Sequence, residues 1–407
     1  MEQTQKELGI YIHIPFCKQK CYYCDFISYS NKTDLVEEYI ESISKEIQDW
    51  KNNTNIEKYK ISTIYIGGGT PSYIEEKHIM QILENLKEFI NPIQETEVIT
   101  PLERKMVEEN KQELNSQVEI TIEVNPGIVT KSKLEQYKKA GINRLSIGLQ
   151  ETHDELLKQI GRIHTYSQFK ETYNLAKEVG FENINIDLMI GLPNQTIQHI
   201  KENLEKVIKL EPSHISVYSL ILEENTVLEK QVCQGKLTLP DEEQERAMYW
   251  YVKNTLELNG YNQYEISNFA KKEKESKHNM NCWEQEEYRG FGIAAHSYIG
   301  GIRFSNTSTL EEYIKNVKEN NLNRNIQVHE IQEKEDMQKE YMLLGLRKLE
   351  GVSISKFKNK YGENPIFLYH EELQELVESK LIKIDGDRIK LTNRGLDLAN
   401  QVWEKFV

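Results

Sequence analysis

The chain has 407 residues, a formal net charge of −14 and an apolar fraction of 38%. This length predicts two or three domains and excludes a small disulfide-stapled fold, and the excess of acidic residues argues against nucleic acid as a partner. No uncharged apolar run approaches the roughly 20 residues of a membrane-spanning helix, so we expect at most peripheral membrane association. The polar start of the chain lacks the pattern of a signal peptide, which predicts a cytoplasmic location.

The first half of the chain alternates short β-branched or aromatic runs with amphipathic segments rich in Glu and Lys. This pattern is typical of parallel strands joined by helices, and we expect an α/β fold in which six units form an incomplete (β/α)6 barrel. The predicted strands cover residues 10–14, 62–66, 119–124, 144–149, 185–189 and 215–220. Several end in Gly, Asn or Pro turns, and the carboxyl ends of parallel strands converge on one mouth, where we expect the site.

Composition divides the chain into three predicted domains. Residues 1–239 form the partial barrel, in which residues 91–117 are a polar surface insertion that is partly helical over 101–114. Residues 240–330 form an α+β extension, and residues 331–407 form a C-terminal domain of helices followed by a small hairpin, which resembles a winged helix. Because no basic stripe runs along this last domain, we favour a packing or interaction role over DNA binding.

Cysteine usage is the sharpest signal in the sequence. Cys17, Cys21 and Cys24 form a C-x3-C-x2-C run directly after the first predicted strand, whereas Cys233 is expected to be an ordinary thiol. Clustered thiols in a reducing compartment indicate metal binding. Three thiolates on one loop can hold three irons of a four-iron, four-sulfur cluster and leave the fourth iron open for a non-protein ligand. The alternative is a zinc site completed by His13 in an interaction protein, although zinc ligands more often come in C-x2-C pairs.

The cysteine spacing resembles that of the radical S-adenosylmethionine superfamily. The resemblance implies a 4Fe-4S cluster whose open iron binds the amino and carboxylate groups of S-adenosylmethionine. Glycine allows close approach of the backbone to the cofactor, acidic groups suit ribose hydroxyls, and Arg suits a carboxylate. The positions that match the cofactor pocket of similar proteins are Tyr11, Tyr23, Gly68, Gly69, Thr70, Glu123, Gln150, Arg162 and Asp187.

Longer stretches resemble the oxygen-independent coproporphyrinogen III oxidase group over nearly the whole chain. They cover residues 11–17, 141–150, 161–164, 187–195 and 264–269. The group contains decarboxylating oxidases and HemW-type heme chaperones, and two departures favour the chaperones. Phe26 stands where the oxidases carry a fourth cysteine, and only ten residues precede Tyr11, whereas the oxidases have a long N-terminal extension. The oxidase activity remains the alternative, and an unrelated radical reaction stays open.

A third feature that favours the chaperones lies in residues 278–283. This segment resembles the His-Asn-x-x-Tyr-Trp heme-binding motif of the chaperones, with Cys282 in place of Tyr. The resemblance implies that His278 and Cys282 are candidate heme-iron ligands and that Trp283 packs on the porphyrin. From composition alone, His278 is a loop histidine beside a charged run. The implied partners are heme, client hemoproteins and an electron donor, and similar proteins lack oxidase activity.

Overall fold

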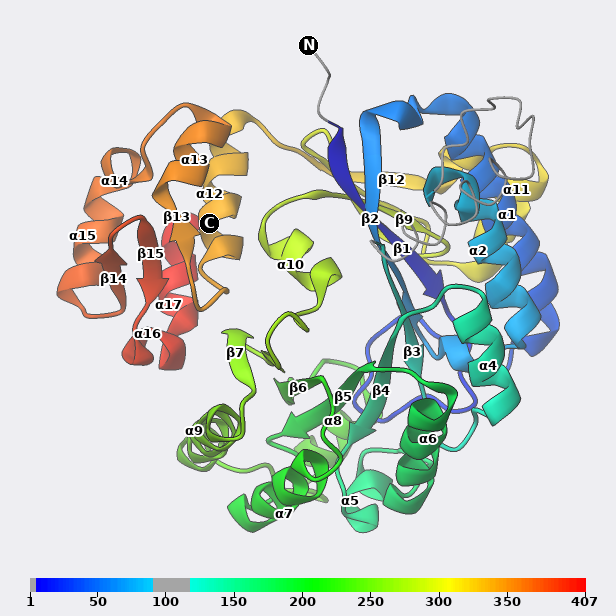
Figure 1. The fold of residues 1–407 in the computed structure, drawn as a ribbon, viewed down its shortest axis with the longest axis horizontal. Coiled ribbons are helices and arrows are strands. Elements are labelled where there is room, and N and C mark those ends of the chain that lie inside the picture. The colour runs from blue at the N-terminus through cyan, green and yellow to red at the C-terminus, as the bar shows by residue number, and fades with distance from the viewer. Residues whose placement is uncertain (1–4, 91–117) are drawn as a thin grey trace, which may run out of the picture.

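A 12-stranded sheet organises the computed structural model, which describes residues 5–90 and 118–407. Six strands pair side by side in chain order and run parallel (Figure 1). They are β1 (Lys6–Ile14), β2 (Tyr59–Gly68), β3 (Glu119–Val124), β4 (Arg144–Gln150), β5 (Asn183–Ile190) and β6 (His214–Ser219). The predicted incomplete barrel of six β/α units is therefore confirmed. The predicted insertion at residues 91–117 lies outside the described residues.

The sheet extends beyond these six strands at both edges. At one edge, β9 (Glu287–Phe291) pairs in parallel with β1, and the sheet continues antiparallel through β10 (His296–Ile299), β11 (Ile302–Asn306) and β12 (Ile326–Ile331). At the other edge, β6 pairs with β8 (Asn268–Ala270), which pairs with β7 (Asn262–Glu265). The predicted extension over residues 240–330 thus continues the sheet of the barrel.

The outer face of the parallel strands carries apolar side chains such as Ile12, Ile64 and Leu145, which pack with the covering helices into one core. The helices that follow the strands are α1 (Val36–Asn53), α2 (Glu76–Ile90), α4 (Lys131–Lys139), α5 (Asp154–Gln159), α6 (Tyr166–Val179), α7 (Ile197–Ile208), α8 (Val227–Cys233) and α9 (Glu242–Leu258). Short 3-10 helices are η1 (Thr33–Leu35), η2 (Ile56–Lys58), η3 (Pro71–Tyr73), η4 (Leu322–Asn325) and η5 (Glu404–Phe406).

The inner face of the same strands is polar. The Tyr65 hydroxyl on β2 donates to Glu123 Oε1 on β3 at 2.9 Å, and the Ser146 hydroxyl on β4 donates to Asp187 Oδ2 on β5 at 3.2 Å. Parallel strands that are buried on both faces are ordinarily apolar on both. Hydrogen-bonded polar groups in their place indicate that the barrel interior serves a ligand.

The C-terminal region has a separate apolar core built from residues between Tyr341 and Phe406. It contains α12 (Lys334–Gly345), β13 (Val352–Ser353), α13 (Ile354–Tyr361), α14 (Pro365–Leu368), α15 (His370–Glu378), β14 (Ile382–Asp385), β15 (Arg388–Leu391), α16 (Asn393–Asp397) and α17 (Ala399–Trp403). Its three strands form a second sheet in the order β13-β15-β14. Helices with a small antiparallel sheet agree with the predicted α+β character, and the winged-helix resemblance stays a prediction.

Two further helices lie between the barrel helices and the C-terminal region in the chain, and one of them connects the two parts. The short α10 (Lys277–Trp283) contacts β2 of the barrel on one side and α12 of the C-terminal region on the other (Figure 1). The second, α11 (Leu310–Lys318), packs against α1. None of the helices in the described ranges combines the length and the apolar character that crossing a membrane requires.

Candidate functional site

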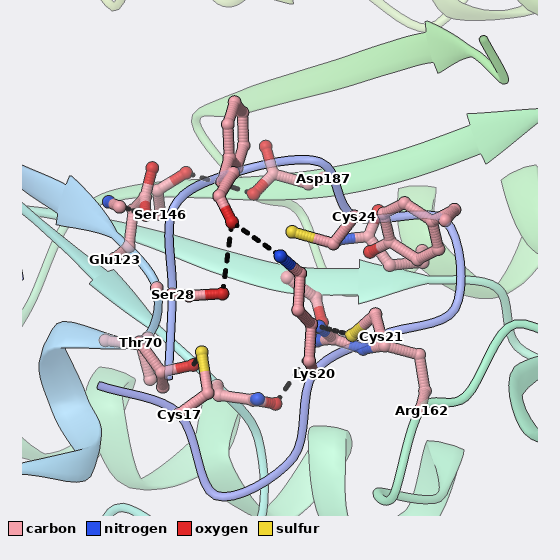
Figure 2. A pocket seen from close by; sticks show the side chains of 18 of the residues that line it. Cys17, Lys20, Cys21, Cys24, Ser28, Thr70, Glu123, Ser146, Arg162 and Asp187 are labelled. Atoms are coloured by element: carbon pink, nitrogen blue, oxygen red, sulfur yellow. Dashed lines mark hydrogen bonds between the residues drawn. The ribbon is translucent and has the colours of Figure 1, made fainter. Parts of the chain in front are cut away.

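A cavity of about 410 Å³ lies at the carboxyl ends of the parallel strands, where the sequence predicted the site. Its wall contains Cys17, Cys21 and Cys24 and all but one of the nine predicted cofactor-binding residues. Figure 2 shows the three thiols on one loop, facing acidic and hydroxyl side chains that come from the strands. The cavity-lining residues from the prediction are Tyr23, Gly68, Gly69, Thr70, Glu123, Gln150, Arg162 and Asp187.

Hydrogen bonds within the cysteine loop and to neighbouring segments hold it in place. The Cys17 N–H donates to the Tyr29 carbonyl at 2.9 Å, and the Tyr22 N–H donates to the Ile160 carbonyl at 3.0 Å. Within the loop, the Lys20 ammonium donates to the Phe26 carbonyl at 2.9 Å. These bonds fix the loop so that its three thiols lie on the cavity wall.

Two of the thiols accept hydrogen bonds from predicted cofactor-binding residues. The Thr70 hydroxyl donates to Cys17 Sγ at 3.4 Å, and Arg162 Nη1 donates to Cys21 Sγ at 3.6 Å. Burial raises the pKa of Cys17, and burial raises the pKa of Cys24 to about 11. These two thiols are thus protonated at neutral pH, and metal binding must displace their protons.

The predicted alternative, a zinc site completed by His13, does not form. Both ring nitrogens of His13 are engaged, Nδ1 with the Tyr11 hydroxyl at 3.0 Å and Nε2 with the Ile27 carbonyl at 2.9 Å. Among the described residues, no three His, Cys, Asp or Glu side chains lie close enough to bind a single metal ion. Three thiolates from one loop can instead bind three separate irons of a cluster.

The glycine run beside the loop leaves no space for side chains. Gly68 has a φ of 112°, in the left-handed region, and its N–H donates to Glu123 Oε2 at 3.2 Å. A Cβ at Gly69 would lie 3.0 Å from Cys17 Sγ and 3.0 Å from the Ile14 carbonyl oxygen. The backbone here can therefore approach a bound group as closely as the sequence predicted.

Gly161 explains why the segment around Arg162 packs against the cysteine loop. Its φ is 76°, and a Cβ there would lie 2.7 Å from the Tyr22 ring. The neighbouring Arg162 donates to Asn125 Oδ1 at 3.2 Å and to the Gly148 carbonyl, while its Nε is buried without a partner in the described residues. An unsatisfied guanidinium N–H beside the thiols is suited to a carboxylate.

Burial raises the pKa of both acidic side chains of the cavity. Burial, together with the charge of Asp187, raises the pKa of Glu123 to about 7. Burial also raises the pKa of Asp187, although Asn185 Nδ2 donates to its Oδ1 at 2.7 Å and favours the charged form. At the end of β4, Gln150 adopts a φ of 70°, which is uncommon for a residue other than glycine and is typical of functional positions.

Several cavity residues were missed by the sequence reasoning, and one predicted residue is absent from the wall. Tyr65, Ser146 and Tyr218 line the cavity from the inner face of the strands. Side chains two residues apart on a strand lie on the same face. Tyr65 could therefore have been predicted from Gly67, and Ser146 from Gly148. Tyr11 was predicted to line the cavity, but it lies behind the wall, where its ring stacks on Tyr65 with centroids 6.4 Å apart.

The predicted heme motif occupies α10, so His278 is a buried helical residue and not a loop histidine. Its Nδ1 is hydrogen-bonded to the Thr63 hydroxyl at 2.8 Å, and its ring stacks on Tyr65 with centroids 5.2 Å apart. Burial lowers the pKa of His278 to about 4, so the imidazole is neutral. Tyr65 therefore separates the cavity from the heme-motif helix, because it contacts both.

The rest of the motif is partly buried. Cys282 follows His278 by one helical turn, and burial raises the pKa of its thiol to about 11. The ring of Trp283 stacks on the guanidinium of Arg347 at 4.5 Å, which ties α10 to the C-terminal region. Cys233, predicted to be an ordinary thiol, is exposed and donates to Glu229 at 3.3 Å.

Comparisons with known proteins agree with this geometry. Residues 11–207 match the Radical SAM superfamily, and residues 332–398 match the HemN C-terminal domain. The chain is 38% identical to the heme chaperone HemW of Bacillus subtilis, over 98% of both chains. It is also 38% identical to the heme chaperone HemW of Lactococcus lactis, over 99% of this chain and 98% of that one. The solved structure of the coproporphyrinogen III oxidase HemN from Escherichia coli shares the fold, with a TM-score of 0.79, 22% identity and coverage of 99% and 90% of the two chains.

Proposed function

This chain belongs to the HemW family of heme chaperones, and on that premise we propose that it binds heme and delivers it to client hemoproteins. The observation that carries the proposal is identity over almost the full length of both chains, which includes the barrel, α10 and the C-terminal region. The likeness to the oxidase rests on 22% identity and concerns the fold alone. We place the protein in the cytoplasm, with at most peripheral contact with a membrane and with no nucleic-acid partner.

We propose that Cys17, Cys21 and Cys24 hold a 4Fe-4S cluster and that S-adenosylmethionine binds in the adjoining cavity. Three thiols on one wall, a glycine cradle and the unsatisfied Arg162 Nε fit these groups. When bound, such a cluster supplies single electrons, which requires an electron donor. Arg162 would hold the cofactor carboxylate, and Glu123 and Asp187 would accept hydrogen bonds from its ribose.

For heme, we propose His278 as an iron ligand and Cys282 as the candidate second ligand. Metal-binding histidines commonly fix the ring through a hydrogen bond on the nitrogen that does not bind the metal. The Thr63 hydroxyl makes such a bond to Nδ1, which leaves Nε2 as the nitrogen for iron. Because the His278 side chain is buried, we propose that α10 moves when heme enters. Phe26, which is 63% exposed on the cavity wall, offers an apolar surface to a porphyrin.

The test is an anaerobic reconstitution of the cluster followed by a hemin titration, with coproporphyrinogen conversion assayed in parallel. We expect stoichiometric heme binding without formation of protoporphyrinogen, and turnover would instead identify an oxidase. His278→Ala should weaken heme binding and leave the iron content of the cluster unchanged. The matched control is His370→Ala, which removes an exposed histidine at the start of α15.

A further inference from the structure

The barrel interior holds the buried guanidinium of an arginine. Arg144 lies on the inner face of β4, two residues before Ser146, and is 2% exposed. Within the described ranges its guanidinium makes no salt bridge, and its Nε is buried without a hydrogen-bond partner. Buried arginines are ordinarily paired, because an uncompensated charge in the interior is strongly unfavourable.

A second unsatisfied donor lies next to it. Thr121 on β3 is the register partner of Arg144, and its hydroxyl is fully buried without a hydrogen-bond partner in the part of the chain described here. Adjacent parallel strands are about 4.8 Å apart, so the two side chains rise side by side into the barrel. A guanidinium and a hydroxyl at this spacing can both donate to one anionic group.

Two histidines near this pair already make hydrogen bonds. His214 binds Asn185 Oδ1 at 2.6 Å through Nδ1 and the Tyr264 hydroxyl at 2.7 Å through Nε2. His278 is bonded to Thr63, as described above. The positive charge of Arg144 lowers the pKa of both histidines, which burial has already lowered, so neither adds a charge at neutral pH. The two histidines therefore add no positive charge to that of Arg144, whose charge also lowers the pKa of the neighbouring Asp187.

We propose that Arg144 and Thr121 form a carboxylate-binding subsite in the barrel interior, and that it receives a propionate of the heme. The location favours this ligand because Thr121 is the register partner of Tyr65, whose ring stacks on His278 of the heme-motif helix, whereas Arg162 lines the cofactor cavity. The inference rests on the proposed heme binding and adds a specific anchor for it. The neighbouring Asp187 accepts hydrogen bonds from Asn185 and Ser146 and forms no salt bridge with Arg144 within the described residues, although the charge of Arg144 lowers its pKa.

The test compares hemin, which has free propionates, with hemin dimethyl ester, in which they are capped. We expect Arg144→Met to weaken hemin binding at least tenfold and to leave binding of the ester within twofold of the wild type. Arg144→Lys, which keeps the charge but loses the planar fork, should give an intermediate loss. Equal hemin affinity of the wild type and Arg144→Met would overturn the subsite, as would an equal loss of affinity for hemin and the ester.

Thermal unfolding of the full chain without heme separates this role from a structural one. Removing an uncompensated charge should leave the melting temperature of Arg144→Met unchanged or raise it. The control is Arg289→Met, which breaks a buried pair whose Arg289 Nη2 lies 2.8 Å from Glu46 Oε1 and should lower the melting temperature. A comparable fall in Arg144→Met would assign Arg144 to the fold and refute the proposal.

S-adenosylmethionine binding distinguishes the source of the carboxylate. We expect Arg144→Met to bind this cofactor as the wild type does, and a selective loss would instead assign the subsite to the cofactor carboxylate and overturn the heme assignment. Failure of the wild-type protein to bind hemin would refute the proposed function itself. Hemin binding that is insensitive to Arg144 would refute only the subsite.

Discussion

Glu123 makes the stability of the ligand-free barrel depend on pH. Burial among cavity residues raises its pKa from 4.5 to about 7 in the folded protein. The folded state therefore retains a proton that the unfolded state has lost, and stability falls as the pH rises from about 4.5 to about 7. We expect Glu123→Gln, which removes the charge but keeps the shape, to abolish this loss.

The size of the effect follows from the shift. A rise from 4.5 to about 7, at about 1.4 kcal/mol per unit, corresponds to about 3 kcal/mol of stability lost by the wild type above neutrality. With an unfolding entropy of about 2 cal/mol/K per residue, a chain of 407 residues gains about 4 °C from such a change. Asp187 is present in both proteins, so its own titration largely cancels from the comparison.

The assay is the melting temperature of the ligand-free protein between pH 5 and pH 8. The advantage of Glu123→Gln over the wild type should be small at pH 5 and should grow to about 4 °C at pH 8. Glu84→Gln removes an exposed charge on α2 and controls for the change in net charge. Parallel profiles for Glu123→Gln and the wild type would refute the reasoning.

Three other substitutions probe separate parts of the molecule. Cys21→Ser should abolish the brown cluster chromophore and lower bound iron after reconstitution, whereas Cys233→Ser should retain both. Arg162→Lys should weaken S-adenosylmethionine binding at least tenfold by equilibrium titration, since a charge-assisted hydrogen bond contributes about 1.5–3 kcal/mol; unchanged affinity would remove Arg162 from the cofactor site. Arg289→Met should destabilise the protein by about 3–5 kcal/mol in denaturant unfolding, because it leaves the Glu46 carboxylate buried without its cation.

Local signals account for what the sequence predicted well. The parallel strands were predicted from short β-branched or aromatic runs between amphipathic segments, as at residues 144–149 for β4, and such runs are visible without any structure. The cysteine loop is a single short segment whose chemistry depends on spacing alone. Turn residues after the strands, such as Gly68, marked the ends at which the cavity opens.

Long-range contacts account for what was missed. The pairing of β9 with β1 joins segments more than 270 residues apart, and no short-range pattern indicates it. The same holds for His278, whose burial depends on Thr63 and Tyr65 from a strand far earlier in the chain. Tyr11 was placed on the cavity wall by resemblance, but its side chain lies behind Tyr65, a residue that the motif does not include.

Tyr65 links the two halves of the barrel interior. Its hydroxyl holds Glu123 in the cofactor cavity, and its ring packs on His278 of the heme-motif helix. If heme draws His278 away from Tyr65, the ring loses a stacking partner, and the hydrogen bond that favours the charged form of Glu123 changes with it. Coupling between two binding sites is reciprocal. The factor by which heme would change the affinity for S-adenosylmethionine is then also the factor by which S-adenosylmethionine would change the affinity for heme. Tyr65 is therefore the side chain through which the proposed cofactor site and the proposed heme site would influence each other.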